Sequence, residues 1–236
     1  MHDMAPRTLA DFDVLTFDCY GTLIDWEAGI LAALRAVLDE HRLSVADDQL
    51  LEQFARYEAA AEGGPYLPYR QVLARALAGI AAEQGFEPTA AQTTRFSDSV
   101  GDWPPFPDSA AALARLKEHF KLGVITNCDT DLFARSNERL GVEFDWVITA
   151  QQLGSYKPNP RNFELARQII GGPPERHLHV AQSLFHDHVP AQAFGLTTAW
   201  IDRRHDRPGF GATPPAEAKP DFSFPDMASF AEAAIR

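Results

Sequence analysis

Four groups of polar side chains stand at the ends of short apolar segments of this chain. They are Asp18, the pair Thr126–Asn127, Lys157 and the pair His186–Asp187. A carboxylate can act as a covalent nucleophile, which divides one difficult displacement into two easier steps. A lysine within ~4–6 Å favours the ionised, reactive form of such a carboxylate. We therefore predict nucleophilic catalysis at Asp18, assisted by Lys157.

The apolar segments alternate with stretches that have helical spacing. We expect strands at 13–17, 121–126, 146–149, 177–181 and 198–201, and helices at 109–119, 131–140, 161–170, 189–194 and 229–235. Strands that alternate with helices in this way form parallel sheets through right-handed crossovers. The prediction is an α/β fold with a Rossmann-like parallel sheet and helices on both faces. Ligands of such sheets bind at the carboxyl ends of the strands, where the polar groups lie.

A long helical region interrupts this alternation after the first strand. Helical spacing runs over 26–62 and again over 69–84, and Gly63-Gly64-Pro65 separates the two stretches. Three prolines within 103–108 end the region, because proline cannot continue a helix. We predict a core domain of residues 1–24 and 106–236, and a helical domain of residues 25–105 inserted into it.

The composition limits the class of protein and its partners. Of 236 residues, 45% are hydrophobic, which excludes a wholly disordered chain. The net charge of -12 argues against a nucleic-acid partner or an anionic membrane surface. The chain has no apolar run of the ~20 residues needed to span a bilayer, no secretory signal in its acidic first residues, and two cysteines. We expect a cytoplasmic protein with a small-molecule substrate, and a homodimer is left open.

The polar groups resemble, in order, the four motifs of the haloacid dehalogenase superfamily. The matching segments are Asp18-Cys-Tyr-Gly-Thr-Leu23, Ile125-Thr-Asn127, Tyr156-Lys-Pro158 and Asp187. The resemblance covers the whole core, and the helical insertion stands where that family inserts its cap. It implies that Asp18 is the covalent nucleophile and that Lys157 and Asp187 assist it. Thr22, Thr126 and Asn127 would orient Asp18 or donate to developing negative charge.

Position 20 distinguishes the two chemistries of this superfamily. Its phosphatases have a second Asp there, which protonates the leaving group, whereas this chain has Tyr20. A halide leaves without a proton, so the motif resembles the L-2-haloacid dehalogenase branch. That branch converts a small 2-haloacid to a 2-hydroxy acid through an aspartyl ester and needs no metal. The alternative is a phosphatase whose magnesium ion Asp18 and Asp187 would hold.

Three positions depart from the dehalogenase branch. Phe163 stands where the branch has a tyrosine, and Gln182 and Leu184 replace a serine and an asparagine before Asp187. These changes alter the residues expected to position the hydrolytic water. They also leave open a third hypothesis, a degenerate relative that binds a ligand or a partner without turnover.

A 2-haloacid also needs a cation for its carboxylate, which the branch takes from the early cap. Arg56 and Arg70 are the candidates here, because a guanidinium can bind a carboxylate with two hydrogen bonds. Candidates for the wall of the pocket are Trp26, Tyr57, Tyr66 and Tyr69, although aromatic side chains at such positions pack in cores at least as often.

Overall fold

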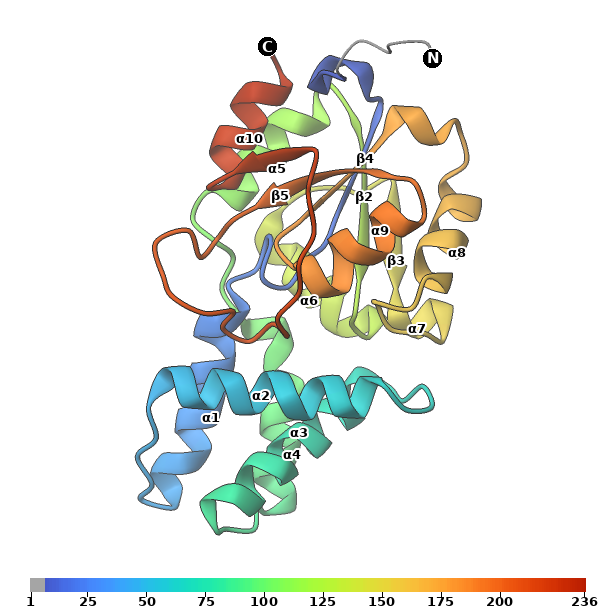
Figure 1. The fold of residues 1–236 in the computed structure, drawn as a ribbon. Helices are drawn as coiled ribbons and strands as arrows, with labels where there is room; N and C mark the ends of the chain where they lie inside the picture. Colours follow the sequence, from blue (N-terminus) through green and yellow to red (C-terminus); the bar gives the residue numbers. More distant parts are fainter. Residues whose placement is uncertain (1–6) are drawn as a thin grey trace.

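Six parallel strands form the central sheet in the order β3-β2-β1-β4-β5-β6 (Figure 1). They are β1 (Val14–Phe17), β2 (Lys121–Thr126), β3 (Trp146–Thr149), β4 (His177–Ala181), β5 (Thr197–Ile201) and β6 (Phe222–Phe224). The computed structural model describes residues 7–236. Residues 1–6, which belong to the predicted core domain and to the stretch predicted to lack a secretory signal, lie outside the described residues. The first five strands lie within one residue of their predicted bounds. The edge strand β6 was not predicted, because three residues beside a proline-rich stretch show no periodicity.

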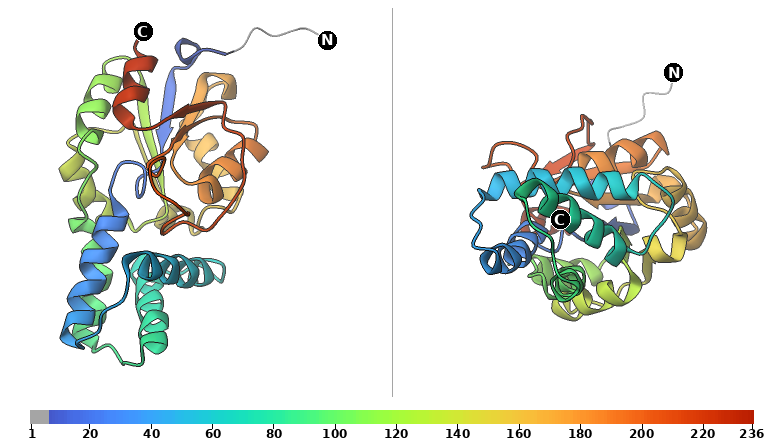
Figure 2. Two further views of the ribbon diagram at one scale, coloured as in Figure 1. Left: turned by 60° about the vertical axis from the view of Figure 1, so that its left-hand side comes forward. Right: turned by 90° about the horizontal axis from the view of Figure 1, so that it is seen from below.

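Helices cover both faces of the sheet (Figure 2). One face carries α5 (Ser109–Lys117), α6 (Thr130–Leu140) and α10 (Met227–Ala234), and the other carries α8 (Arg161–Ile170) and α9 (Val189–Ala193). Shorter turns are α7 (Ala150–Leu153), a π-helical turn (Leu184–His188) and 3-10 turns at Leu9–Asp11 and Pro174–Arg176. The predicted α/β class with a Rossmann-like sheet is confirmed. The strand order reverses at β1, which places the ends of β1, β2 and β4 together as predicted.

Of the α-helices between β1 and β2, the first four lie below the carboxyl edge of the sheet (Figure 1). They are α1 (Trp26–Glu40), α2 (Asp47–Glu62), α3 (Tyr69–Gln84) and α4 (Ala90–Asp98), followed by a 3-10 turn (Ser99–Asp102). The short α4 was not predicted, because it buries one large apolar side chain, Phe96, and shows little periodicity. We refer to α1–α4 as the cap; the exact domain boundaries stay a prediction.

Within residues 7–236 we find no helix with both the length and the apolarity that a bilayer span requires. The cytoplasmic location and the homodimer stay predictions.

Gly29 allows the start and the end of the cap to pack against each other. It lies in the first turn of α1, where the chain enters the cap, and faces Trp103, where the chain leaves it. A Cβ added at Gly29 would stand 2.1 Å from Cγ of Trp103, whose side chain is buried. The close approach fixes α1 directly below the loop that follows β1.

We expect Gly29→Ala to lower the free energy of unfolding by ~1–3 kcal/mol, the usual effect of overpacking a filled core. The opposing gain in helix propensity is about 1 kcal/mol, and it does not relieve the clash. Chemical denaturation measures the change. Gly64→Ala is the control, since its Cβ would approach no atom closer than 3.9 Å. An unchanged midpoint for Gly29→Ala would show that Trp103 can move.

Candidate active site

Asp18 is held at the end of β1 by a tight loop. Its backbone N–H donates to Val180 O of β4 at 3.1 Å, which continues the sheet by one residue. Gly21 has φ of +93°, a conformation that favours glycine, and it turns the chain back on itself. The turn brings Thr22 to Asp18, and the Thr22 hydroxyl donates to Asp18 Oδ2 at 2.6 Å. One carboxylate oxygen of Asp18 is therefore fixed by its own loop.

Asn127 holds the backbone of Lys157 from both sides. Its Oδ1 accepts from Lys157 N at 2.8 Å, and its Nδ2 donates to Lys157 O at 2.9 Å. The Lys157 side chain is 1% exposed, so the ammonium group is removed from water. The end of β2 thus sets the position of the loop that follows β3.

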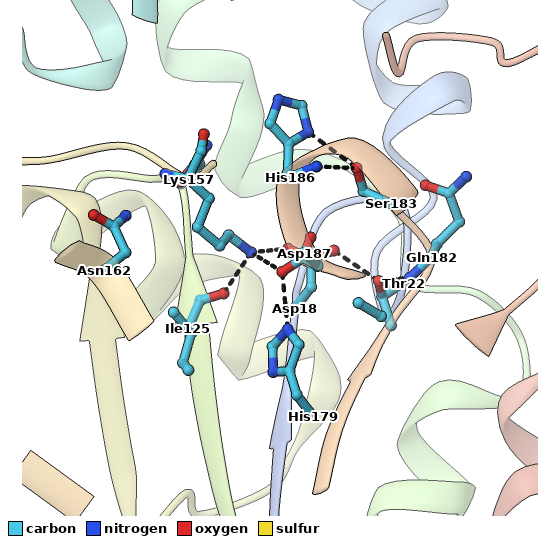
Figure 3. Close-up of polar contacts among 12 residues, drawn as sticks. Asp18, Thr22, Ile125, Lys157, Asn162, His179, Gln182, Ser183, His186 and Asp187 are labelled. Atoms are coloured by element: carbon cyan, nitrogen blue, oxygen red, sulfur yellow. Dashed lines mark hydrogen bonds and ion pairs between the residues drawn. The ribbon is translucent and has the colours of Figure 1, made fainter. Parts of the chain in front are cut away.

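The Lys157 ammonium lies between two carboxylates (Figure 3). Its Nζ is 2.9 Å from Asp18 Oδ1, 2.6 Å from Asp187 Oδ1 and 2.8 Å from Ile125 O. The three partners match the three donors of an ammonium group, so its hydrogen-bonding capacity is used. His179 Nε2 lies 2.9 Å from Asp187 Oδ1 and braces that carboxylate from below.

Burial and charge act on these groups in opposite directions. Burial raises the pKa of Asp18 above its ordinary value, and the Lys157 ammonium and the Thr22 hydroxyl oppose this rise. Burial also acts to raise the pKa of Asp187, but Lys157 and His179 outweigh it and hold that pKa well below its usual range. Burial disfavours the charge of Lys157, yet the two carboxylates keep its pKa above the ordinary value. The lysine acts on Asp18 in the predicted direction, but burial has the larger effect.

We expect activity to fall on acidification with a midpoint above the ordinary Asp pKa of about 4. Only ionised Asp18 can attack, and its raised pKa means that protonation begins at a higher pH than for an exposed aspartate. Thr22→Val removes a contact that lowers this pKa, so its midpoint should lie higher still. The pH profile of kcat/KM measures both. A wild-type profile that stays flat down to pH ~4 would contradict the assignment.

A cavity lies directly above Asp18. Its volume is about 30 Å³, and it adjoins a pocket of about 370 Å³. The cavity is lined by Asp18, Tyr20, Trp26, Glu58, Glu62, Asn127, Lys157, Ser183, His186 and Asp187. Three of these, Glu62, Lys157 and His186, also line the larger pocket. The arrangement suits a small substrate whose reacting atom enters the inner cavity.

Comparison with known proteins agrees with this geometry. Residues 12–184 match the family model described as haloacid dehalogenase-like hydrolase. This chain belongs to the haloacid dehalogenase-like hydrolases.

Two curated relatives and a solved structure resemble most of the length of this hydrolase. The (S)-2-haloacid dehalogenase of Pseudomonas fluorescens is 27% identical, over 86% of this chain and 88% of the relative. Haloacetate dehalogenase H-2 of a Moraxella species is 26% identical, over 91% of this chain and 94% of the relative. The crystal structure of a defluorinating L-2-haloacid dehalogenase has a TM-score of 0.82 and 21% identity, and the match covers 98% of this chain and 100% of that one. The structural match confirms the fold.

The predicted carboxylate-binding arginines of this hydrolase lie elsewhere. Arg56 is 59% exposed and pairs with Glu83 at 2.5 Å. Arg70 binds Asp131 with two hydrogen bonds and Asp98 with a third. Neither lines the cavity above Asp18, so the structure does not support their role in substrate binding, which stays a prediction. Nearby carboxylates hold both guanidinium groups.

The other residues named from the sequence differ in whether they line the cavity above Asp18. Thr126 is buried, and its Oγ1 has neither a hydrogen-bond partner nor a place in the cavity wall. Asn127 lines the cavity, but its amide already donates to Lys157 O. Gln182 and Leu184 line a different pocket and do not line the cavity above Asp18. Phe163 packs edge-on against the ring of His179, with 5.1 Å between the ring centroids.

The Tyr20 hydroxyl lies against the core instead of the nucleophile. It is 3.0 Å from Ser136 Oγ and accepts from Cys128 Sγ at 3.4 Å. Burial raises the pKa of Tyr20 well above its ordinary value. Tyr20 therefore lines the cavity, while its hydroxyl keeps its proton and is bound to Ser136 and Cys128 in the core.

We expect Tyr20→Phe to keep kcat/KM within ~3-fold of wild type, whereas removal of a general acid lowers activity by ~10²–10⁴-fold. The variant should lose about 1 kcal/mol of stability with the hydroxyl contact. Steady-state kinetics and thermal denaturation separate the two effects. A loss of ~10²-fold would identify Tyr20 as a proton donor.

Sequence reasoning missed three residues of the cavity wall. Glu58 and Glu62 lie one turn apart at the end of α2, and Ser183 caps the turn that carries Asp187. The signal for the two glutamates was present in the sequence. The apolar stripe of α2, which includes Leu51 and Phe54, continues at helical spacing into these acids. A carboxylate on the buried face of a helix indicates a functional site, whereas most carboxylates lie on solvated faces.

The carboxylates of the site do not fit a magnesium ion. Mg²⁺ requires near-octahedral oxygen ligands at ~2.0–2.1 Å. Asp187 Oδ1 is already bound to Lys157 and His179, and the Lys157 ammonium stands between Asp187 and Asp18. Asp187 Oδ2 is the one carboxylate oxygen of this pair without a hydrogen-bond partner. Over residues 7–236, no cluster of three His, Cys, Asp or Glu side chains could hold a metal.

Proposed function

We propose that this chain is a hydrolytic dehalogenase that displaces halide from C2 of a small 2-haloacid or a derivative of one. In the first step an oxygen of Asp18 bonds to C2, and halide leaves with the electron pair of the carbon–halogen bond. An aspartyl ester remains on the enzyme. Water then attacks the ester carbonyl of Asp18, which releases the 2-hydroxy product, a proton and the free carboxylate.

The residues around Asp18 support this sequence of steps. Thr22 and Lys157 each hold one carboxylate oxygen, which orients the nucleophile before attack. The same two donors face the oxygens on which negative charge develops when water adds to the ester. Asp187 keeps Lys157 charged and in place. The groups that orient Asp18 and stabilise the developing negative charge are thus held in place by hydrogen bonds before the substrate binds.

The observation that carries the proposal is the position of the Tyr20 hydroxyl. A phosphate monoester leaves as an alkoxide and needs a proton, whereas a halide does not. The group two residues after the nucleophile is bound to Ser136 and Cys128, so it cannot supply that proton. Together with the poor fit for magnesium, this favours carbon over phosphorus as the electrophile. Several relatives of this chain are named as dehalogenases, which supports the same choice.

Halide release tests the proposal directly. The substrates are bromoacetate, L-2-chloropropionate and fluoroacetate, each beside its amide, and Asp18→Asn serves as the blank. A single turnover in water labelled with a heavy oxygen isotope should place the label in the peptide that contains Asp18, because water attacks the enzyme carbonyl.

Two results would overturn the proposal. One is the absence of Asp18-dependent halide release from every compound of the panel. The other is EDTA-sensitive release of phosphate from small phosphate esters, which would establish the phosphatase alternative. Label found in the product after one turnover, with none in the enzyme, would reject the ester mechanism while leaving dehalogenation in place.

A further inference from the structure

Three polar side chains are buried in the sheet behind the active site. Strands that are covered on both faces usually consist of apolar residues, because a polar group there costs free energy unless it is hydrogen-bonded. Here Thr16 of β1 and His177 and His179 of β4 are all buried. Thr16 is the register partner of His179, and His177 stands two residues earlier on β4. The three side chains therefore lie on one face of the sheet.

Hydrogen bonds join these three side chains to Asp187. Thr16 Oγ1 lies 2.7 Å from His177 Nε2 and 2.9 Å from His179 Nδ1. The other ring nitrogen of His179, Nε2, lies 2.9 Å from Asp187 Oδ1 (Figure 3). Since Asp187 Oδ1 also accepts from Lys157 at 2.6 Å, a continuous chain of hydrogen bonds runs from the amino end of β4 to the ammonium group of the site.

The chemistry of the partners gives this chain a direction. The pKa of Asp187 is held well below its usual range, so its carboxylate can only accept and His179 Nε2 carries a proton. A neutral ring has one N–H, which leaves Nδ1 of His179 to accept from the Thr16 hydroxyl. The Thr16 oxygen accepts in turn from His177, because burial lowers the pKa of that histidine to about 3 and leaves its ring neutral. Each group thus donates to the next one toward Asp187.

This arrangement leaves one oxygen of Asp187 free. Its Oδ1 is bound by Lys157 and His179, whereas its Oδ2 is buried without a hydrogen-bond partner, and Asp187 lines the cavity above Asp18. A free carboxylate oxygen at this place can accept a hydrogen bond from the water that hydrolyses the ester. Because two donors hold Oδ1, they also set the position of Oδ2.

We propose that Thr16 and His177 are positioning residues for ester hydrolysis, and that they act through His179 on Asp187. They hold Nε2–H of His179 toward Asp187 and so aim Oδ2 at the hydrolytic water. The water oxygen bonds to the ester carbonyl carbon of Asp18, and the bond from that carbon to the product oxygen breaks. One proton of the water passes through Asp187 Oδ2 to the product oxygen, and the other leaves when the Asp18 carboxyl group ionises. The inference rests on the proposed dehalogenation and assigns residues to its second step.

Thr16→Val tests the inference, because it removes the hydroxyl at nearly constant volume. We expect the rate constant for ester hydrolysis to fall by ~10-fold or more, since a misplacement of ~1 Å can cost ~10²-fold in rate. The rate constant for ester formation should be unchanged, because Thr22 and Lys157 still hold Asp18. Bromide release and the mass of the acid-quenched protein, followed through one turnover of bromoacetate, measure the two steps separately.

Two matched variants separate positioning from packing. Thr16→Ser keeps the hydroxyl and should restore ester hydrolysis. Thr198→Val removes a buried hydroxyl from the next strand, because Thr198 is the register partner of His179 on β5 and its hydroxyl accepts from Gln192 at 3.1 Å. This control should hydrolyse the ester at the wild-type rate. If Thr198→Val slows hydrolysis as much as Thr16→Val does, the hydroxyl of Thr16 serves the packing of the sheet and the inference is wrong.

Nitrogen NMR spectra of the histidine rings test the same chain without turnover. We expect the ring proton of wild-type His179 at Nε2, and faster exchange of that proton with water in Thr16→Val. A proton at Nδ1 of wild-type His179 overturns the inference. Ester hydrolysis in Thr16→Val that equals the wild-type rate, or that falls together with ester formation, overturns it as well. A wild-type protein that forms no ester overturns the proposed function, and the inference with it, before any variant is compared.

Discussion

Asp18→Asn is expected to reduce halide release by ~10⁴-fold or more, the range found when a covalent nucleophile is removed. The neutral amide cannot displace halide, so no ester forms. The rest of the site should survive. The single oxygen of Asn at this position can still accept from Lys157, which is 2.9 Å from Oδ1 in the wild type, and its NH2 group can donate to the Thr22 hydroxyl oxygen, which is 2.6 Å from Oδ2. Steady-state halide release measures the loss.

Circular dichroism and thermal denaturation supply the control for this variant. Asp18 is one of two carboxylates that share Lys157, and the other, Asp187, keeps the ammonium paired at 2.6 Å. We therefore expect a folded protein. Asp18→Asn that retains activity within ~10-fold of wild type would show that the nucleophile is another residue.

Lys157→Met should affect both activity and stability. Its removal leaves Asp18 and Asp187 buried without a cation, and breaking a buried ion pair from one side costs ~3–5 kcal/mol. Activity should fall by ~10³-fold, because the nucleophile loses the group that orients it and opposes its protonation. The pH midpoint of any remaining activity should rise, since the lysine lowers the pKa of Asp18. Urea denaturation and a pH profile of kcat/KM measure the two effects.

A second substitution separates these effects. Asp187→Asn in the Lys157→Met background removes one of the two unpaired charges and should restore part of the lost stability. It should not restore activity, because Asp18 still lacks its cation. Additive losses in the double variant would show that Lys157 and Asp187 do not stabilise each other.

The core of the site could be predicted from the order of elements and of polar residues. In a parallel sheet the carboxyl ends of the strands meet at one edge, so polar groups at those ends converge wherever the sheet forms. Asp18, Lys157 and Asp187 meet in this way, over distances of 2.6–2.9 Å. The brace from His179 was not predicted, because the chain must turn back after β4 before Asp187 can reach that ring.

The cap shows where local patterns stop being informative. Helices α1–α3 have apolar stripes that their sequences reveal, but a stripe does not specify the angle at which a helix meets the sheet. Arg56 and Glu58 are two residues apart on α2, which puts them on different faces. Sequence reasoning chose the arginine from the expected chemistry, whereas the structure turns the glutamate toward the nucleophile.

The amino-acid sequence by itself therefore determined the α/β sheet, the place of the cap and the meeting of Asp18 with Lys157, because strand periodicity and strand ends are local properties. The tertiary structure alone decided which cap side chains face Asp18 and that the Tyr20 hydroxyl is bound in the core. Both depend on how helices far along the chain are rotated against the sheet. Packing of the whole molecule sets that rotation, and no local pattern records it.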